Sequence, residues 1–259
     1  MKGIEATRTI AIVSGKGGVG KTTLTINLGT ALATRFNKRV IIIDGNVTTS
    51  HIGLYLGMYY SPVTLNQVLR GEAKIENAIY DHYSGVKIIP ASLSLKELEK
   101  VDITKLETSV RKLFGATDFI LIDTAPGLGK ETISALKASE EVIFVTTPFI
   151  PPVMDIIRTN LIAKELDLKV LGIVLNMVRG EKYELKAEEV EQLTEVPVIS
   201  SIPLDKNVLK SLASKMPVVV YNPKCKASKE IFKLAAKVLN VSEEEKGILT
   251  KLLEFLRLR

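Results

Sequence analysis

The sequence predicts an α/β fold: one large domain with a doubly wound, mostly parallel sheet that is flanked by helices on both faces. Three observations support this prediction. Short runs of β-branched apolar residues recur along the 259 residues, and helix-like stretches separate many of them. These runs are nearly continuous rather than alternating, as in strands that are buried on both faces. No linker that would split the domain interrupts the pattern before Ser242.

The apolar runs are the expected strands. They comprise residues 8–14, 39–44, 86–91, 118–124, 141–147, 171–178, 197–203 and 217–221. Their alternation with helices implies right-handed crossovers between parallel strands. In such folds ligands bind beyond the carboxyl ends of the strands, so the functional residues are expected there.

The expected helices carry signals of their own. Residues 21–36 place Leu24, Leu28 and Leu32 four positions apart, and therefore on one face of a helix. Three other helices are indicated by residues at one end. Gly115 is a candidate C-cap at the end of residues 103–115, and Asp205 is a candidate N-cap. Pro151 and Pro152 follow an expected strand and are expected to start a helix.

Composition limits the class of protein. The formal net charge is +6 and the isoelectric point is about 9.2, an excess that permits nucleic acid or an acidic membrane surface as a partner without requiring either. The N-terminus has too short an apolar run for a signal peptide, and no apolar run is long enough to span a membrane. Cys225 is the only cysteine, so no intrachain disulfide forms and a cysteine-ligated cluster is disfavoured. These features favour a cytoplasmic protein.

The glycine-rich segment from Gly15 to Thr22 follows the first expected strand and opens the first expected helix. It satisfies G-x-x-x-x-G-K-[ST], and its position between strand and helix supports the motif. Glycines let backbone N–H groups curl around a phosphate, and the helix N-terminus adds partial positive charge. Lys21 is expected to reach the β- and γ-phosphates, and the Thr22 hydroxyl is expected to ligate Mg²⁺. The segment predicts a P-loop NTPase domain.

A second segment, FILIDTAPG, ends an apolar strand on Asp123. A carboxylate at this place can hold Mg²⁺ through water, as the Walker-B aspartate does. An aspartate at a strand end is weak evidence alone, but it is a strong indication in a chain that also has a phosphate loop. Gly127 lies just beyond and would let the backbone move with the γ-phosphate.

The loop GKGGVGKTT resembles the deviant Walker A loop, K-G-G-x-G-K-[ST], of the MinD/ParA family of dimerising ATPases. Further segments match that family in the same order, namely IIIDGNVTTSHIGLYLG, DFILIDTAPG, VTTPFIPPVMD, GIVLNMV and IPLDKNV. The resemblance covers essentially the whole chain and is greatest to archaeal MinD-type members. The resemblance implies ATP or ADP as ligands, together with Mg²⁺.

In that family the first lysine of the loop reaches across a dimer to the phosphates of the partner subunit. The resemblance therefore implies that Lys16 is this signature lysine and that the chain forms a homodimer when ATP is bound. A cation from the opposite chain would neutralise the γ-phosphate at the interface. ADP lacks that phosphate, so the dimer would depend on ATP.

The resemblance also implies the nucleotide-binding residues. The phosphate-binding set is Gly15, Lys16, Gly17, Gly18, Val19, Gly20, Lys21, Thr22 and Thr23. The adenine-binding set is Asn176, Pro203, Leu204 and Asp205. An asparagine offers both a donor and an acceptor, which suits an adenine edge. Asp205 is also the candidate N-cap, and the two roles are compatible.

The chain departs from the family pattern after the second expected strand. Family members usually have D-x-D there, and the second aspartate lies in switch I and is tied to hydrolysis, whereas this chain has Asp44 followed by Asn46. An amide cannot act as a carboxylate base, so we expect slow hydrolysis with nucleotide binding retained. Phe149 also stands where members often have an acidic residue. The expected catalytic set is Lys16, Lys21, Asp44 and Asn46.

Residues 242–259 are expected to form an amphipathic tail, appended to the ATPase domain of residues 1–241. Its apolar residues share an arc of roughly 160° at about 100° per residue. They are Ile248, Leu249, Leu252, Leu253, Phe255 and Leu256. A basic amphipathic helix of this kind can lie in an anionic lipid surface, and two copies in a dimer would bind more strongly through avidity. A helix packed on the domain or on a partner is the alternative.

The leading interpretation is an ATP-dependent dimeric switch that positions other proteins at the cytoplasmic face of the membrane, with a protein partner that the sequence does not identify. One alternative is a ParA-like ATPase whose ATP dimer binds DNA non-specifically through surface lysines and arginines. Another is a nucleotide-binding scaffold that hydrolyses ATP slowly or not at all, which Asn46 would favour.

Overall fold

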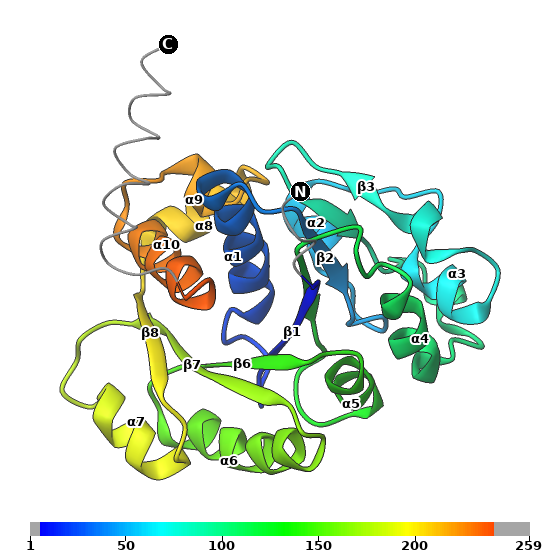
Figure 1. The fold of residues 1–259 in the computed structure, drawn as a ribbon. Helices are drawn as coiled ribbons and strands as arrows, with labels where there is room; N and C mark the ends of the chain where they lie inside the picture. The colour runs from blue at the N-terminus through cyan, green and yellow to red at the C-terminus, as the bar shows by residue number, and fades with distance from the viewer. Residues whose placement is uncertain (1–5, 241–259) are drawn as a thin grey trace.

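The computed structural model of the chain describes residues 6–240. An eight-stranded sheet forms its centre (Figure 1). Its strands are β1 (Arg8–Val13), β2 (Val40–Asp44), β3 (Tyr80–Asp81), β4 (Lys87–Ile89), β5 (Phe119–Asp123), β6 (Glu141–Thr146), β7 (Lys169–Val178) and β8 (Val198–Pro203). Their spatial order is β3-β4-β2-β5-β1-β6-β7-β8. All neighbours are parallel except β3 and β4, so the predicted mostly parallel sheet is confirmed.

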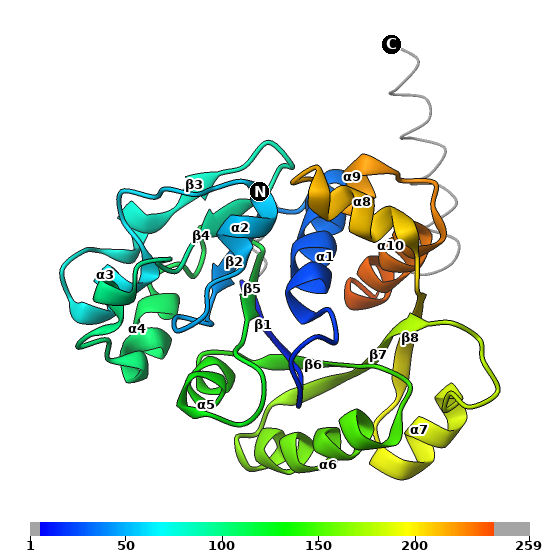
Figure 2. The same cartoon turned by 180° about the vertical axis from the view of Figure 1, so that it is seen from behind.

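Helices cover both faces of the sheet, which confirms the doubly wound architecture (Figures 1 and 2). The α-helices are α1 (Lys21–Phe36), α2 (Ile52–Leu56), α3 (Leu65–Arg70), α4 (Leu106–Arg111), α5 (Lys130–Lys137), α6 (Ile150–Glu165), α7 (Ala187–Thr194), α8 (Lys206–Ala213), α9 (Val218–Tyr221) and α10 (Lys226–Val238). The short 3₁₀ helices are η1 (Ile75–Ala78), η2 (Leu95–Leu98) and η3 (Ile103–Lys105). Helices α1, α2, α9 and α10 pack on one face, and α3 to α7 pack on the other.

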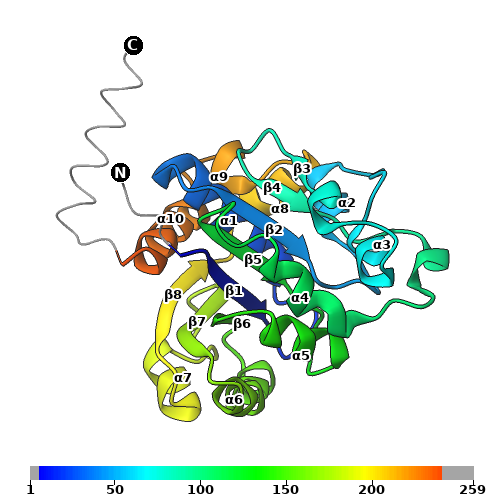
Figure 3. The same cartoon turned by 45° about the vertical axis from the view of Figure 1, so that its right-hand side comes forward.

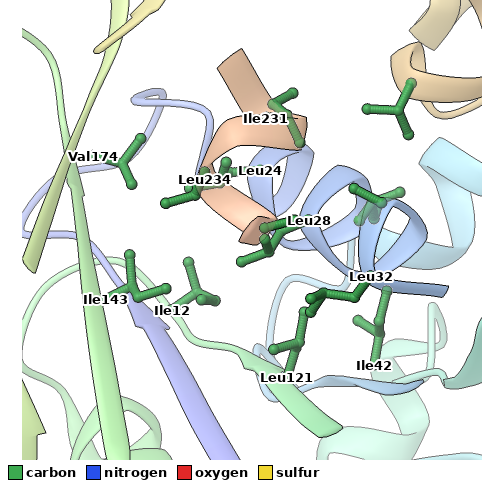
Figure 4. Close-up of a cluster of buried hydrophobic side chains, with 14 of the residues drawn as sticks. Ile12, Leu24, Leu28, Leu32, Ile42, Leu121, Ile143, Val174, Ile231 and Leu234 are labelled. Carbon is green, nitrogen blue, oxygen red and sulfur yellow. The ribbon is translucent and has the colours of Figure 1, made fainter. Parts of the chain in front are cut away.

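The core beneath α1 explains why this helix holds its place. Leu24, Leu28 and Leu32 are buried as their spacing predicts, and they face strand residues such as Ile12 and Leu121 (Figure 4). Side chains of α10, which packs beside α1 on the same face of the sheet, complete this cluster. Because each buried leucine contributes about 1.5–3 kcal/mol, this packing fixes the helix that begins at Lys21 of the phosphate loop.

Two expected elements were wrong. Residues 217–221 form helix α9 and not a strand. Pro217 starts the turn, because its carbonyl oxygen accepts the N–H groups of Val220 at 3.0 Å and Tyr221 at 2.9 Å. Val218 and Val219 are still buried against α1, so the run satisfies its apolar character without joining the sheet. The helix expected to end at Gly115 ends at Arg111, and Gly115 lies in the turns that follow it.

Two expected helix starts are confirmed. Helix α6 begins at Ile150, and the two prolines occupy its first turn. Asp205 is the N-cap of α8, where its side chain accepts the N–H of Asn207 at 2.8 Å. Within residues 6–240, no helix combines the length and the apolar character needed to cross a membrane. The predicted tail lies outside the described residues.

Candidate nucleotide site

The phosphate loop lies at the carboxyl end of β1, between the central strand and α1. Strand β1 is flanked by β5 and β6, and Figure 3 shows β1, β2 and β5 side by side. Gly18 and Gly20 have φ angles of +82° and +85°, which glycine adopts without the penalty that a Cβ would cause. A Cβ at Gly15 would lie 2.1 Å from Cβ of Asp155 in α6, so this loop residue is pressed against a neighbouring helix.

Lys21, Thr22 and Asp123 form one bonded group. The Lys21 ammonium lies 2.8 Å from Oδ1 of Asp123 and also donates to the Thr124 carbonyl oxygen. The Thr22 hydroxyl donates to Oδ2 of Asp123 at 2.6 Å, and the Thr25 hydroxyl donates to Oδ1 at 3.2 Å. The structure thus brings the predicted lysine, threonine and aspartate together at the carboxyl ends of β1 and β5.

A cavity of about 330 Å³ lies above this group. It is lined by Ser14, by the loop from Lys16 to Thr23, and by Asn46 and Thr49 from the segment after β2. All of the predicted phosphate-binding residues except Gly15 contribute to its wall. Its size suits the phosphates and part of a nucleoside, since small-molecule sites are usually about 300–1,000 Å³.

The two lysines of the loop differ in their surroundings. The Lys21 side chain is 7% exposed and is paired with a buried carboxylate. Lys16 is exposed at the rim of the cavity, and no hydrogen bond or ion pair of its side chain occurs among the described residues. Lys21 is therefore bonded within its own chain, whereas the Lys16 ammonium has no bonded partner among the described residues.

The end of β2 and the residues after it lie beside the cavity. Asp44 is fully buried, and its Oδ2 accepts the Ser50 hydroxyl at 2.7 Å and two backbone N–H groups. Its Oδ1 is buried without a hydrogen-bond partner in the part of the chain that the structure describes. Burial raises the pKa of Asp44 to about 7, and the nearby Asp123 carboxylate adds to the rise.

Asn46 is buried at the same wall. Its Oδ1 accepts the Thr49 hydroxyl at 3.0 Å and the Thr49 N–H at 3.3 Å, which holds the turn after β2. Phe149, at the start of α6, is exposed and stacks on Tyr183 with ring centroids 6.4 Å apart.

A smaller pocket of about 90 Å³ adjoins the phosphate cavity. The predicted adenine-binding residues Asn176, Pro203, Leu204 and Asp205 all line it. Nδ2 of Asn176 donates to the Val19 carbonyl oxygen at 2.8 Å, so this asparagine already bonds to the phosphate loop. Asp205 caps α8 and also accepts the N–H of Ala227 at 3.3 Å.

Some wall residues were not anticipated from the sequence. Thr49, His51, Tyr55, Met177 and Leu212 line the phosphate cavity, and the last two line the base pocket as well. Thr49, His51 and Tyr55 lie in a segment that matches the family pattern, and Met177 follows the predicted Asn176, but none of the four was assigned a role from the sequence. A more open cleft of about 710 Å³ lies beside the base pocket at the start of α8 and α10.

The oxygen donors of the site fit a magnesium ion. Thr22 and Asp123 present a hydroxyl and a carboxylate 2.6 Å apart below the phosphate cavity, and hard oxygen donors are the ligands that Mg²⁺ prefers. The Asp44 carboxyl, whose Oδ1 is buried without a partner among the described residues, lies near Asp123, whose charge contributes to the raised pKa of Asp44. We propose that Thr22 binds Mg²⁺ directly and that Asp123 binds it through water.

The geometry defines a class of protein, the P-loop NTPases, because the loop joins a central parallel strand to a helix and its lysine and threonine meet the aspartate of the adjacent strand. Within that class the chain belongs to the ParA family. The family model, described as "NUBPL iron-transfer P-loop NTPase", matches residues 5–239.

Similar proteins point in the same direction. The chain is 37% identical over 235 residues to an uncharacterized ATP-binding protein of Methanocaldococcus jannaschii, covering 91% of this chain and 89% of the relative. The cell division ATPase MinD of Pyrococcus furiosus is 36% identical, with a TM-score of 0.87 over 91% of this chain and 99% of that chain. The septum site-determining protein MinD of Pyrococcus horikoshii, solved with Mg-ADP, is 36% identical with a TM-score of 0.86, over 94% and 98%. The predicted MinD/ParA family and the predicted fold are confirmed.

The iron-transfer part of the family description has no matching residues in this chain. Cys225 is the only cysteine, and iron–sulfur clusters are held mostly by four cysteine thiolates. Its thiol is buried at the start of α10, with Sγ 3.2 Å from the Ser228 hydroxyl oxygen. The ATPase part of the family chemistry is the part that the site residues match.

Proposed function

We propose that the chain is an ATP-operated dimeric switch that hydrolyses ATP slowly and positions other proteins at the cytoplasmic face of the membrane. The observation that carries this proposal is the contrast between the two loop lysines, one buried in its own site and the other exposed at the rim. ATP and ADP with Mg²⁺, the ligands expected from the sequence, agree with the Mg-ADP bound to the P. horikoshii relative.

Lys21 serves the nucleotide of its own subunit. Without nucleotide, its ammonium neutralises Asp123. The phosphates of ATP bring a stronger negative charge into the cavity, so Lys21 turns toward them and stabilises the charge that develops on the γ-phosphate. Magnesium held by Thr22 and Asp123 would supply further neutralisation of the phosphate oxygens.

Lys16 serves the nucleotide of the second subunit. An unpaired ammonium at the rim is strongly hydrated, and it gains an anionic partner when another molecule presents its γ-phosphate there. Because ADP lacks that phosphate, the two-subunit state forms with ATP and dissociates after hydrolysis. This cycle is what makes the molecule a switch.

Asn46 sets the length of the ATP-bound state. The side chain lines the phosphate cavity, but an amide cannot take a proton from the attacking water. Slow cleavage prolongs the dimer, and a partner protein that completes the site would shorten it. We assign membrane binding by the dimer to the C-terminal tail, whose apolar face suits the lipid interface and whose basic residues suit anionic lipids. Binding to DNA through surface lysines and arginines is the competing function.

Size-exclusion chromatography with ATP or ADP tests the proposal. We expect the wild-type chain to elute as a dimer with ATP and as a monomer with ADP. Lys16→Ala should bind ATP with unchanged affinity and remain a monomer, whereas Lys21→Ala should lose ATP binding itself. Lys164→Ala, at an exposed position near the end of α6, is the matched control and should behave as wild type. An ATP dimer of Lys16→Ala would sink the proposal.

A further inference from the structure

Met177 has a backbone conformation that is unusual for its place in the fold. Its φ angle is +59°, and it lies inside strand β7. The other described non-glycine residues with positive φ each follow a helix by one or two positions, where the left-handed conformation is common. They are Asn37, Lys100, Asp167, Glu195, Lys215 and Asn240. Left-handed backbone disfavours residues with a Cβ, so Met177 is held there by its surroundings.

A β-bulge produces this conformation. Leu175 pairs with Ser201 and Val178 pairs with Pro203, so Asn176 and Met177 together stand opposite a single residue of β8. A bulge changes the direction of a side chain relative to the regular alternation of a strand, and bulges are frequent beside functional sites. Here the extra residue follows directly after the asparagine of the base pocket.

The bulge aims the Met177 side chain over the end of the phosphate loop. A Cβ on Gly20 would stand 2.3 Å from Nδ2 of Asn176 and 3.2 Å from Cε of Met177, so the two side chains together cover that glycine. Met177 and Leu212 line both the phosphate cavity and the base pocket. The two side chains therefore stand on the path between the two halves of the site.

The base pocket and the phosphate cavity are separate spaces while this wall is in place. Their volumes are about 90 Å³ and about 330 Å³, whereas an ordinary small-molecule site is a single space of about 300–1,000 Å³. A nucleotide with its base in one space and its phosphates in the other must displace the side chains that separate them.

We propose that Met177 is a displaceable partition in the nucleotide site, and that it sets the affinity for the nucleoside part of ATP and ADP. The proposal rests on the proposed function, because it takes the pocket of Asn176 as the base site. Methionine suits the role, since its side chain is unbranched and flexible and its thioether is polarizable. The closed arrangement competes with the nucleotide, so the apparent affinity is reduced by the fraction of chains that are open.

Calorimetric titration of the full chain with ATP, ADP and inorganic tripolyphosphate tests the partition. Met177→Ala removes the side chain, and Met177→Gly also removes the backbone penalty. If the wall is open in roughly 10–30% of wild-type chains, both variants should bind ATP and ADP about three- to tenfold more tightly. Neither should change the affinity for tripolyphosphate, which needs only the phosphate cavity. Met177→Leu retains the bulk and should bind ATP as wild type or more weakly.

Two controls separate the possible failures. Glu195→Gly relieves a left-handed residue at the end of α7 that lines neither the phosphate cavity nor the base pocket, and it should leave all three affinities unchanged. Asn176→Ala should weaken ATP binding but not tripolyphosphate binding if the base site is correct. If Asn176→Ala binds ATP more weakly than wild type while Met177→Ala binds it with unchanged or lower affinity, the partition is overturned and the base site stands. Unchanged ATP affinity in both variants overturns the base site and the partition together.

Discussion

The ammonium nitrogen of Lys21 lies 2.8 Å from Oδ1 of Asp123, and the two side chains are 7% and 1% exposed. Within the structure, the lysine that is expected to bind phosphate is thus bonded to the aspartate that is expected to hold magnesium. Each group neutralises the other while no nucleotide is present. The pair links the stability of the free chain to the residues that bind ATP.

Breaking this pair should destabilise the free chain. We expect Lys21→Met to lower the free energy of unfolding by about 3–5 kcal/mol without nucleotide, because it leaves the Asp123 carboxylate buried without a cation. Adding Asp123→Asn to that variant should restore much of the loss, since no charge then remains unpaired. Urea unfolding of both single variants and of the double variant measures the coupling. A loss below about 1 kcal/mol in Lys21→Met would contradict a buried ion pair between Lys21 and Asp123.

Stability should fall as the pH rises between about 4 and 7. Burial raises the pKa of Asp44 to about 7, whereas an unfolded aspartate titrates near about 3.9. Between these values the folded chain holds a proton that the unfolded chain has lost. The resulting contribution to stability is fully present below about pH 4 and is lost as the pH rises through about 7. Asp44→Asn should remove the effect, because an amide oxygen can still accept from Ser50.

Urea unfolding at pH 5 and pH 8 compares Asp44→Asn with wild type. We expect wild type to lose at least about 1.4 kcal/mol more than the variant, which corresponds to one pKa unit. Burial lowers the pKa of His82, which acts in the opposite direction, but this contribution is common to both chains and cancels. Parallel pH profiles would show that Asp44 does not titrate as inferred.

Asn46→Asp should accelerate hydrolysis. The substituted carboxylate keeps an acceptor for the Thr49 hydroxyl and N–H, so the turn after β2 is preserved while a base is added. Positioned general bases contribute about 10²–10⁴-fold, and we expect a gain of at least about tenfold in phosphate release. Asn46→Ala is the comparison and should give no gain. A wild-type rate that already equals that of the Asp variant would refute slow hydrolysis as a consequence of Asn46.

The tail should determine which surface the ATP form binds. We expect the full chain to sediment with anionic liposomes in ATP more than in ADP, and a chain ending at Ser242 to remain in the supernatant. The double variant Leu252→Glu and Leu253→Glu keeps the length of the tail and should also abolish sedimentation. Sedimentation that persists without the tail would exclude the membrane role assigned to it, and a salt-sensitive gel shift of random DNA with ATP would favour the DNA alternative.

The sequence predicted the sheet core and the phosphate loop because both depend on local pattern. Apolar runs such as 118–124 can be satisfied only where both faces are covered, and the glycine loop is meaningful only between a strand and a helix. The adenine-binding residues came from family resemblance, and the structure gathers them around one pocket. Their roles in binding remain predictions.

The errors arise where neighbours outweigh local preference. The valines of α9 have strong strand preference, but Pro217 starts a turn and Asn27 of α1 accepts the Val219 N–H at 3.2 Å, so the segment coils onto α1. The bulge at Met177 was equally hidden, because it depends on the register between β7 and β8. A register between strands is a long-range property, and no residue pattern within β7 indicates it.

The order of the strands has a consequence for synthesis of the chain. Strand β1, which the phosphate loop follows, pairs with β5 and β6. Arg8 can therefore pair only after Phe119 is made, and Ile10 only after Glu141 is made. Contacts of such separation in sequence are slow to form. Because domains are made from the N-terminus, β1 and the loop that follows it are translated before β5 and β6, so β1 has no partner strand in the sheet until β5 has emerged. ATP can therefore assist folding only late, after β6 has left the ribosome.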